Sequence, residues 1–437
     1  MFDDNGQSLT GATPQAVIEY ERACDELLCY TGDPVASVGR ALDHSADFTM
    51  AHYLKAWLHL VGSENSGLVV ANTVLGATAT LSHNPREALH RQALRALVNG
   101  QIDAARQQLE EILLEHPRDL LALQVAHLFD FYCGDSRSLR DRPARVAHAW
   151  SLQDRRFHAL LGMQAFGLEE CNLYSQAEQA GRQALALNPR DCWAHHAVTH
   201  VYEMQGRQAQ GIAWMTERQP LWADDSFFAI HHWWHLALFH LDLDQVDPVL
   251  ALYDQRLRGS CSGVVLDLVD AAALLWRLKL RGEELRPRWL ELADAWAAFA
   301  DDDNYAFNSF HAMLAFAGAE RWEQAQLVLD SLNRQLARQG SNHVMACEVG
   351  RPASLGLLHF AHEDYDAAVD QLLPIRHSAH HFGGSHAQRD VIELTLIEAA
   401  QRAGRWPLAR ALASERVAHK PSSPLAQRYL RAALAAG

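Results

Sequence analysis

The chain has 437 residues, of which 49% are apolar and 21% are charged, a composition typical of a folded globular protein. Its 53 acidic residues outnumber 38 basic ones, and the formal charge of -15 excludes a generally basic nucleic-acid-binding surface. No stretch approaches about 18 uninterrupted apolar residues, and the opening MFDDNGQSLTGATP lacks the features of a secretory signal. We therefore expect a cytoplasmic protein with no nucleic-acid partner and no membrane partner.

Helical periodicity dominates the chain. Apolar residues recur at i, i+3, i+4 and i+7 in the runs 104–116, 176–188 and 272–280, which are rich in good helix formers. Strict apolar–polar alternation of strand length is nearly absent. Short breakers containing proline separate the runs, at 83–85, 116–119, 188–191 and 420–424. The pattern predicts an all-α fold.

Internal repeats follow from the positions of small residues. A helix–turn–helix unit starting at Arg86 places Ala105 where its two helices cross and Pro117 where the second helix stops. Equivalent small residues and prolines fall in register in three further units, namely Ala177, Gly181, Ala184 and Pro189; Gly356 and Ala368; and Ala409, Ala413 and Pro421. We expect an α-solenoid of tetratricopeptide-like repeats, curved around a concave groove or pocket. Residues 16–437 would form one domain, after a tail at 1–15.

Several long stretches resemble the tetratricopeptide repeat protein 38 family. They are HHAVTHVYEMQGR (195–207), FFAIHHWWHLALFHLDL (227–243), LYDQRL (252–257), LDLVDAAALLWRL (266–278), FNSFHAMLAFAGA (307–319) and GGSHAQRDV (383–391). The resemblance covers about residue 15 to the end. It implies an all-helical repeat protein, and it leaves the activity open.

Histidines are the most informative polar residues, and the chain has 25 of them. His196 and His200 are four residues apart, so they share one helix face, and His231 and His235 repeat this spacing 35 residues later. A further step of 35 residues reaches Asp270, with Asp267 one turn earlier. If these stretches are equivalent helices of successive repeats, the side chains form a ladder on the inner surface.

Later repeats contribute further candidates. His311 and its neighbour Asn308 extend the ladder in the next unit, and His386 with Arg389 would close its far end.

A divalent metal is one predicted ligand of the ladder. His196, His200, His231 and His235 supply imidazoles, and Asp267, Asp270 or Glu203 supply carboxylates nearby, a set that zinc, iron or manganese accepts. Neither histidine pair contains the glutamate of the HExxH motif, which excludes that class of metalloprotease.

An organic ligand is the second alternative. The histidines, Asp270, Asn308 and Arg389 would share a groove with the indoles of Trp193, Trp233, Trp234 and Trp276. Such a mixed polar and aromatic groove suits a small acid, a metabolite or a peptide end. In a third interpretation, the histidines are packing residues that fix the repeats against one another.

We expect a repeat binding protein with a histidine- and tryptophan-lined concave site for a small molecule or peptide. The predicted ligand-binding set is His196, His200, His231, His235, Asp267, Asp270, Asn308, His311, His386 and Arg389. The first alternative is a metal-dependent enzyme, a hydrolase as first guess, with His200, His235, Asp270 and His311 as catalytic candidates. The second is a protein–protein interaction scaffold. A homo-oligomer stays open, and the chain contains no nucleotide-binding motif.

Overall fold

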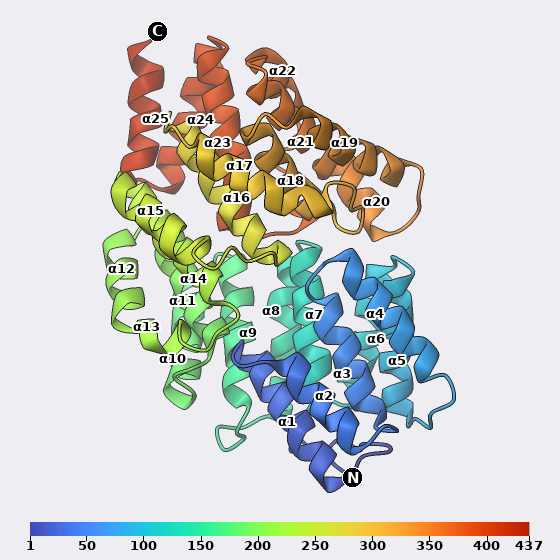
Figure 1. Ribbon diagram of the computed structural model, residues 1–437. Coiled ribbons are helices and arrows are strands. Elements are labelled where there is room, and N and C mark those ends of the chain that lie inside the picture. The colour runs from blue at the N-terminus through green and yellow to red at the C-terminus, as the bar shows by residue number, and fades with distance from the viewer. Residues whose placement is uncertain (437) are drawn as a thin grey trace. The chain divides into compact units, whose positions relative to one another are not determined.

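Helices joined by short turns make up the computed structural model, which describes residues 1–436 (Figure 1). Within that range the backbone pairs in β fashion only at two isolated bridges, Phe2 with Ser8 and Thr31 with Ser226. The all-α prediction is confirmed. None of the helices described is both long and apolar enough to cross a membrane.

The described residues pack as two compact units. One comprises Met1–Val198 with Pro220–Phe228, and the other comprises Thr199–Gln219 with the residues from Ala229 onward. The division falls inside one continuous helix, α11 (Cys192–Met204). The expectation of one domain from residue 16 stays a prediction.

The first unit contains ten helices before α11. They are α1 (Pro14–Cys29), α2 (Pro34–His44), α3 (Thr49–Leu60), α4 (Asn65–Ala77), α5 (Pro85–Val98), α6 (Ile102–Glu115), α7 (Leu120–Tyr132), α8 (Ser136–Val146) with the short η1 (Ala147–Ala149), α9 (Phe157–Glu170) and α10 (Tyr174–Leu187). Ahead of α1, the Asp4 amide donates to Glu21 Oε1 at 2.7 Å, and Leu9 is buried.

The second unit continues the same pattern. Its helices are α12 (Gln208–Glu217), α14 (Ala229–Asp242), α15 (Val246–Leu252), α16 (Val265–Leu280), α17 (Arg286–Trp296), α18 (Ala306–Gly318), α19 (Trp322–Leu336), α20 (Ser341–Met345), α21 (Arg351–Ala361), α22 (Tyr365–Leu372), α23 (His386–Arg402), α24 (Trp406–His419) and α25 (Pro424–Ala435). Shorter turns are α13 (Gln219–Trp222), η2 (Tyr253–Leu257), η3 (Ala297–Phe299), η4 (Ala346–Gly350) and η5 (Ala379–Phe382).

Consecutive helices pack as pairs, as tetratricopeptide-like repeats require. α5 packs on α6, α9 on α10, α21 on α22 and α24 on α25. Small residues lie where the helices of a pair approach closely. Three of them, Ala105, Ala177 and Ala409, have no exposed surface. A methyl group added to Gly356 would lie 2.6 Å from the side chain of Leu372, so a larger residue there would force that side chain between α21 and α22 to move. The predicted repeat positions are therefore confirmed.

Prolines and aspartates set the ends of the helices. Pro117 follows the end of α6, and Pro189 follows the end of α10. Two residues beyond each proline, an aspartate caps the next helix: Asp119 accepts from the Ala122 amide at 2.9 Å, and Asp191 from the Ala194 amide at 2.8 Å. Each cap satisfies a backbone donor that the first helical turn leaves without an intrahelical partner.

In the second unit, α16 packs against α14, α18 and α23. Two of its buried side chains reach α23: Trp276 Nε1 donates to Thr395 Oγ1 at 2.9 Å, and Arg277 donates to the Ala387 carbonyl at 2.6 Å. These bonds fix the helix that carries Asp270.

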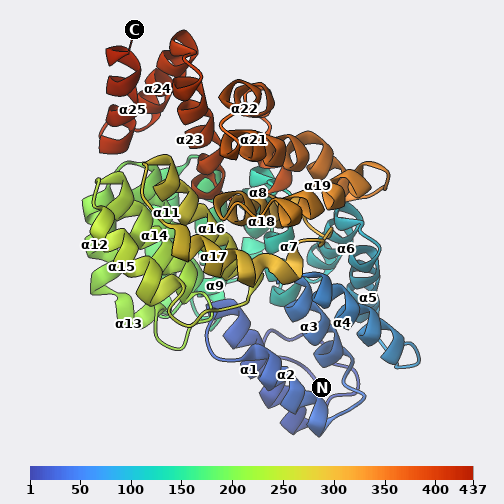
Figure 2. The same ribbon diagram turned by 45° about the horizontal axis from the view of Figure 1, so that its top comes forward.

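The start of α25 is attached to much earlier segments of the second unit. Ser423 Oγ donates to Asp242 Oδ1 at 2.5 Å, across 181 residues, and Ser422 Oγ donates to the Gly206 carbonyl at 3.2 Å. In the view of Figure 2, α23, α24 and α25 lie side by side. Ser423 also caps α25, because its Oγ accepts from the Ala426 amide.

Candidate functional site

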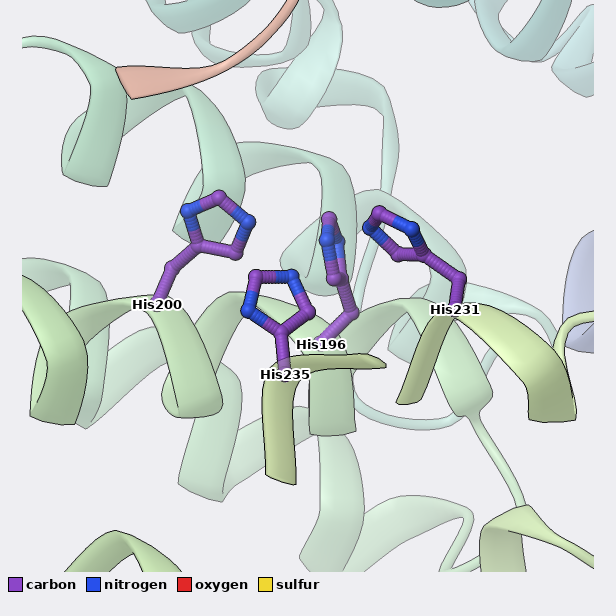
Figure 3. Close-up of side chains that lie close together, drawn as sticks. All are labelled: His196, His200, His231 and His235. Atoms are coloured by element: carbon purple, nitrogen blue, oxygen red, sulfur yellow. The ribbon is translucent and has the colours of Figure 1, made fainter. Parts of the chain in front are cut away.

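Two helices, α11 and α14, each carry a pair of histidines four residues apart. His196 and His200 lie one turn apart on α11, and His231 and His235 one turn apart on α14. The ring centroids of His200 and His235 are 4.5 Å apart, and those of His231 and His235 are 4.8 Å apart. Within the second unit, one ring nitrogen from each of His200, His231 and His235 lies within 4.8 Å of the others. Figure 3 shows the ring of His235 between those of His200 and His231.

Two carboxylates orient the rings of α14. His235 Nδ1 lies 3.0 Å from Glu203 Oε2, and His231 Nδ1 lies 2.8 Å from Asp270 Oδ2. A carboxylate oxygen accepts hydrogen bonds, so Nδ1 carries the proton on both rings. Nε2 is then the nitrogen through which each ring, when neutral, would coordinate a metal.

Burial sets the charge state of these groups. His200 and His235 have no exposed surface, and Glu203 and Asp270 are also buried. Burial, together with neighbouring His200 and His231, holds the pKa of His235 well below its usual range, so the imidazole is neutral. Burial raises the pKa of Glu203, against the attraction of Lys420 and His200.

The two aspartates of α16 differ in their partners. Asp270 Oδ2 contacts His231, whereas its buried Oδ1 has no hydrogen-bond partner within the described part of the chain. Asp267 Oδ2 accepts from Ser262 Oγ at 2.6 Å. Burial raises the pKa of Asp267 to about 6, Ser262 opposes this rise, and the charge of Asp270 adds to it. Asp270 is thus in the histidine cluster, and Asp267 lies beside it.

The other predicted site residues lie elsewhere in the second unit. His311 on α18 is fully buried, with Nδ1 2.8 Å from the Phe307 carbonyl of its own helix, and burial lowers its pKa to about 3. Half-buried Asn308 is on the same helix. Arg389 on α23 bonds to the Gly384 carbonyl and to His386 Nδ1. His311 and His386 are therefore not among the residues that share a cluster with His200, His231 and His235.

The tryptophans proposed as groove residues are buried in helix packing. Trp234 and Trp276 have no exposed surface, and Trp193 and Trp233 are nearly as buried. Trp234 stacks on His231 with centroids 5.3 Å apart, and the Arg277 guanidinium lies 5.6 Å from its ring. In this structure Trp234 holds His231 in place.

Ser385 is the N-cap of α23. Its Oγ accepts from the Gln388 amide, and Gln388 reaches back to the Ser385 amide at 3.0 Å, which is a capping box. The backbone amides of Ser385 and Gln388 thereby gain acceptors from side chains at the start of the same helix.

Sequence reasoning missed two histidine–aspartate pairs in the first unit. His158 Nδ1 lies 2.7 Å from Asp191 Oδ2, and His90 Nε2 lies 3.0 Å from Asp119 Oδ2. Both aspartates are the helix caps described above. The signal was present in the paired stretches HPRD and NPRD, which place an aspartate at equivalent positions of two repeats. These pairs fix one repeat to the next.

Comparison with known proteins adds structures of distant helical proteins. No family model matches the chain. The Cut9 and Hcn1 hetero-tetramer of APC/C is 12% identical over 96% of this chain and 76% of that chain, with a TM-score of 0.45. A human IFIT1 dimer with m7Gppp-AAAA is 15% identical over 100% and 96%, with a TM-score of 0.43. Yeast Tom70 is 12% identical over 97% and 88%, with a TM-score of 0.38.

Proposed function

We propose that this helical-repeat protein is a binding protein whose ligand is a divalent transition metal, with zinc as the first candidate. His200, His231 and His235 supply imidazole ligands, and His196, one turn before His200 on α11, supplies the fourth. The observation that carries the proposal is the approach of ring nitrogens of His200, His231 and His235, all in the second unit, to within 4.8 Å of one another. A tetrahedral zinc site with Zn–N distances of about 2.0–2.1 Å needs nitrogens roughly 3.4 Å apart. Small rotations of the imidazole rings would bring the nitrogens from within 4.8 Å to this shorter distance.

The carboxylates support the same proposal. Histidines that bind metals usually donate their second ring N–H to a carboxylate or a carbonyl, which fixes the tautomer and increases ligand basicity. Asp270 and Glu203 have this relation to His231 and His235. Two buried carboxylates also balance the double positive charge of the ion, which an all-imidazole shell would leave uncompensated.

The number of histidines bound decides what else the site accepts. Four imidazoles fill a tetrahedral shell, which favours binding or a structural role over hydrolysis. If three bind, the fourth position takes water or the carboxylate of a small acid or peptide end, which is the organic ligand expected from the sequence. We retain the resemblance to the tetratricopeptide repeat protein 38 family as part of this proposal.

Metal analysis tests the proposal directly. Untagged protein purified without chelators is assayed by inductively coupled plasma mass spectrometry, and chelator-treated protein is titrated with zinc by calorimetry. We expect about one equivalent per chain, lost in the double variant His200→Ala, His235→Ala. The matched control is His240→Ala, on the same helix, where Nδ1 bonds only Gln245 in the contacts described.

Folding is checked separately by circular dichroism and thermal unfolding. If the double variant does not fold, His231→Gln replaces it, since the side chain of His231 is 14% exposed and tolerates exchange more easily. Absence of zinc, iron and manganese from the purified protein, together with no heat of zinc binding, overturns the proposal.

A further inference from the structure

An open groove of about 600 Å³ runs along helix α1 in the first unit. Helix α1 provides most of its lining, and the turns before α9 and α11 provide Arg155, Asn188 and Arg190. The volume falls within the range of about 300–1,000 Å³ that is usual for ligand sites. The groove shares no lining residue with the histidine cluster, so it is a separate candidate for binding.

One face of α1 borders the groove along its length. Ile18, Arg22, Asp25 and Cys29 follow one another at steps of three or four residues, so they share this face. Ile18 is 61% exposed and offers an apolar contact surface. From Ile18 to Cys29 the helix rises about 16 Å, at 1.5 Å per residue. An extended peptide of about five residues has the same length, because each of its residues adds about 3.3 Å.

The groove is bordered by the segment ahead of α1, whose backbone is bound by side chains of the first unit. The Asp4 amide donates to Glu21 Oε1 at 2.7 Å, and the Asp4 carboxylate accepts from Arg155 at 2.9 Å. The Asn5 carbonyl accepts from Arg118 Nε at 3.3 Å. Side chains beside the groove therefore already bind main-chain donors and acceptors, as recognition of a peptide backbone requires.

Arg190 repeats the position of Arg118 in a later repeat. Each arginine directly precedes the aspartate that caps the next helix, in the stretches NPRD and HPRD. Arg190 donates to the Asp224 carbonyl at 2.8 Å, and its side chain is 46% exposed. A guanidinium has five N–H donors, so Arg190 can also donate to a peptide carbonyl in the groove.

Most carboxylates that line the groove have arginine partners. Besides the contact of Asp4 described above, Asp25 lies 2.9 Å from Arg155, and Glu21 lies 2.6 Å from Arg156. Glu26 also lines the groove, but it forms no ion pair with the described residues, and its buried Oε2 has no hydrogen bond to them. A buried carboxylate oxygen without a partner bears a desolvation cost. A cationic group of a ligand would offset this cost, so the groove favours a positive charge at Glu26.

We propose that this groove binds an extended segment of a partner protein that carries an aliphatic residue and a lysine or arginine four positions apart. Ile18 contacts the aliphatic side chain, and Glu26 pairs with the cation. Glu26 lies eight residues after Ile18, which is about 12 Å along the helix. Four residues of an extended segment span about 13 Å, and side chains four positions apart point to the same side. Both side chains of the segment can therefore face α1.

Fluorescence anisotropy with the full chain tests this inference. The probes are the fluorescein-labelled peptides GLSGSKG and GKSGSLG, which present the leucine and the lysine in the two possible chain directions. The control peptides GLSGSEG and GESGSLG carry glutamate in place of lysine. We expect one lysine peptide to bind with a Kd below about 1 mM, and its glutamate control to bind at least about tenfold more weakly.

Two pairs of variants locate the binding surface. Glu26→Gln keeps the shape of the side chain but removes its charge, and it should weaken binding of the lysine peptide about tenfold. Glu19→Gln is the matched control on the same helix, because Glu19 pairs with Arg40. Ile18→Asp should also weaken binding about tenfold or more, whereas Val69→Asp, at a similarly exposed valine on α4, should leave it unchanged. Circular dichroism shows whether each variant is folded.

Three results of these titrations overturn the inference. They are failure of both lysine peptides to bind, equal binding of the glutamate controls, and unchanged binding to a folded Glu26→Gln or Ile18→Asp variant. Light scattering addresses a different occupant of the groove. A dimer of the full chain that Ile18→Asp dissociates would place a second copy of the chain there, and it would also overturn the inference.

Discussion

His231 and Asp270 are 39 residues apart in sequence, yet Nδ1 of one lies 2.8 Å from Oδ2 of the other. The second oxygen of Asp270 is buried and makes no hydrogen bond to the described residues. The carboxylate therefore bears a desolvation cost that only one contact offsets. A bound cation next to His231 would reduce that cost through its charge.

Asp270→Asn should weaken zinc binding about 10- to 100-fold, the usual range for the loss of a carboxylate that orients a histidine ligand. The amide oxygen still accepts from His231, but the negative charge is gone. Calorimetric titration with zinc measures the change, with Asp267→Asn as the matched control one turn away. If both variants bind zinc as tightly as the original sequence, Asp270 has no part in a metal site.

Asp267 should make stability fall as the pH rises from about 4 to 6. Burial raises its pKa in the folded chain to about 6, above the value of 3.8 for an unperturbed aspartate. Between these values the folded chain binds more protons than the unfolded chain, so the free energy of unfolding decreases with pH. In the original sequence we expect the free energy of unfolding to decrease by about 1–3 kcal/mol over this pH range because of Asp267. The variant Asp267→Asn should lack this decrease. Urea unfolding at several pH values is the measurement, and identical slopes in both proteins would contradict the prediction.

The pair of half-buried Asp390 and buried Arg416 should show strong coupling in a double-mutant cycle. Two hydrogen bonds of 2.6 and 2.9 Å join the side chains of α23 and α24. Burial favours the neutral acid, but the charge and hydrogen bonds of Arg416 outweigh it and hold the pKa of Asp390 below its usual range. Arg416→Leu should cost about 1.5–3 kcal/mol, because it removes two hydrogen bonds from a half-buried carboxylate.

Adding Asp390→Asn to Arg416→Leu should recover a large part of that loss. Urea unfolding of the two single variants and the double variant provides the coupling energy. Additive effects would show that the two side chains act independently, in disagreement with the geometry.

Gly356→Ala should destabilise the second unit, although alanine is the better helix former. The added methyl group would lie 2.6 Å from Leu372, and relieving such overpacking costs about 1–3 kcal/mol. Gly39 on α2 is the matched control, because a methyl group there meets nothing within 4 Å. We expect Gly39→Ala to stabilise the chain by about 0.5–1 kcal/mol. Thermal unfolding compares the two, and a stabilising Gly356→Ala would contradict the close crossing.

The repeats could be predicted because their signal is local. Ala105, Ala177 and Pro117 recur at fixed positions, and the small residues are needed wherever two helices cross. The histidine pairs on α11 and α14 were visible for the same reason, since four residues make one turn. Asp270 was found by the repeat step, and it lies 2.8 Å from His231.

The rest of the candidate site depends on where side chains find partners. His311 occupies the position expected of the next repeat, but its ring bonds to its own helix at the Phe307 carbonyl. Periodicity gives the face of a helix, and it does not give the rotamer.

The bond between Ser423 and Asp242 has a consequence for biosynthesis. At about 5–20 residues per second, a ribosome needs on the order of 10–40 s to add the 181 residues between them. Until Ser423 has been added, Asp242 lacks one of its native donors. The second unit cannot be completed repeat by repeat as the chain emerges. Its last native contacts must wait until translation has passed Ser423, and a nascent chain stalled before that residue would expose an unfinished surface to chaperones and proteases.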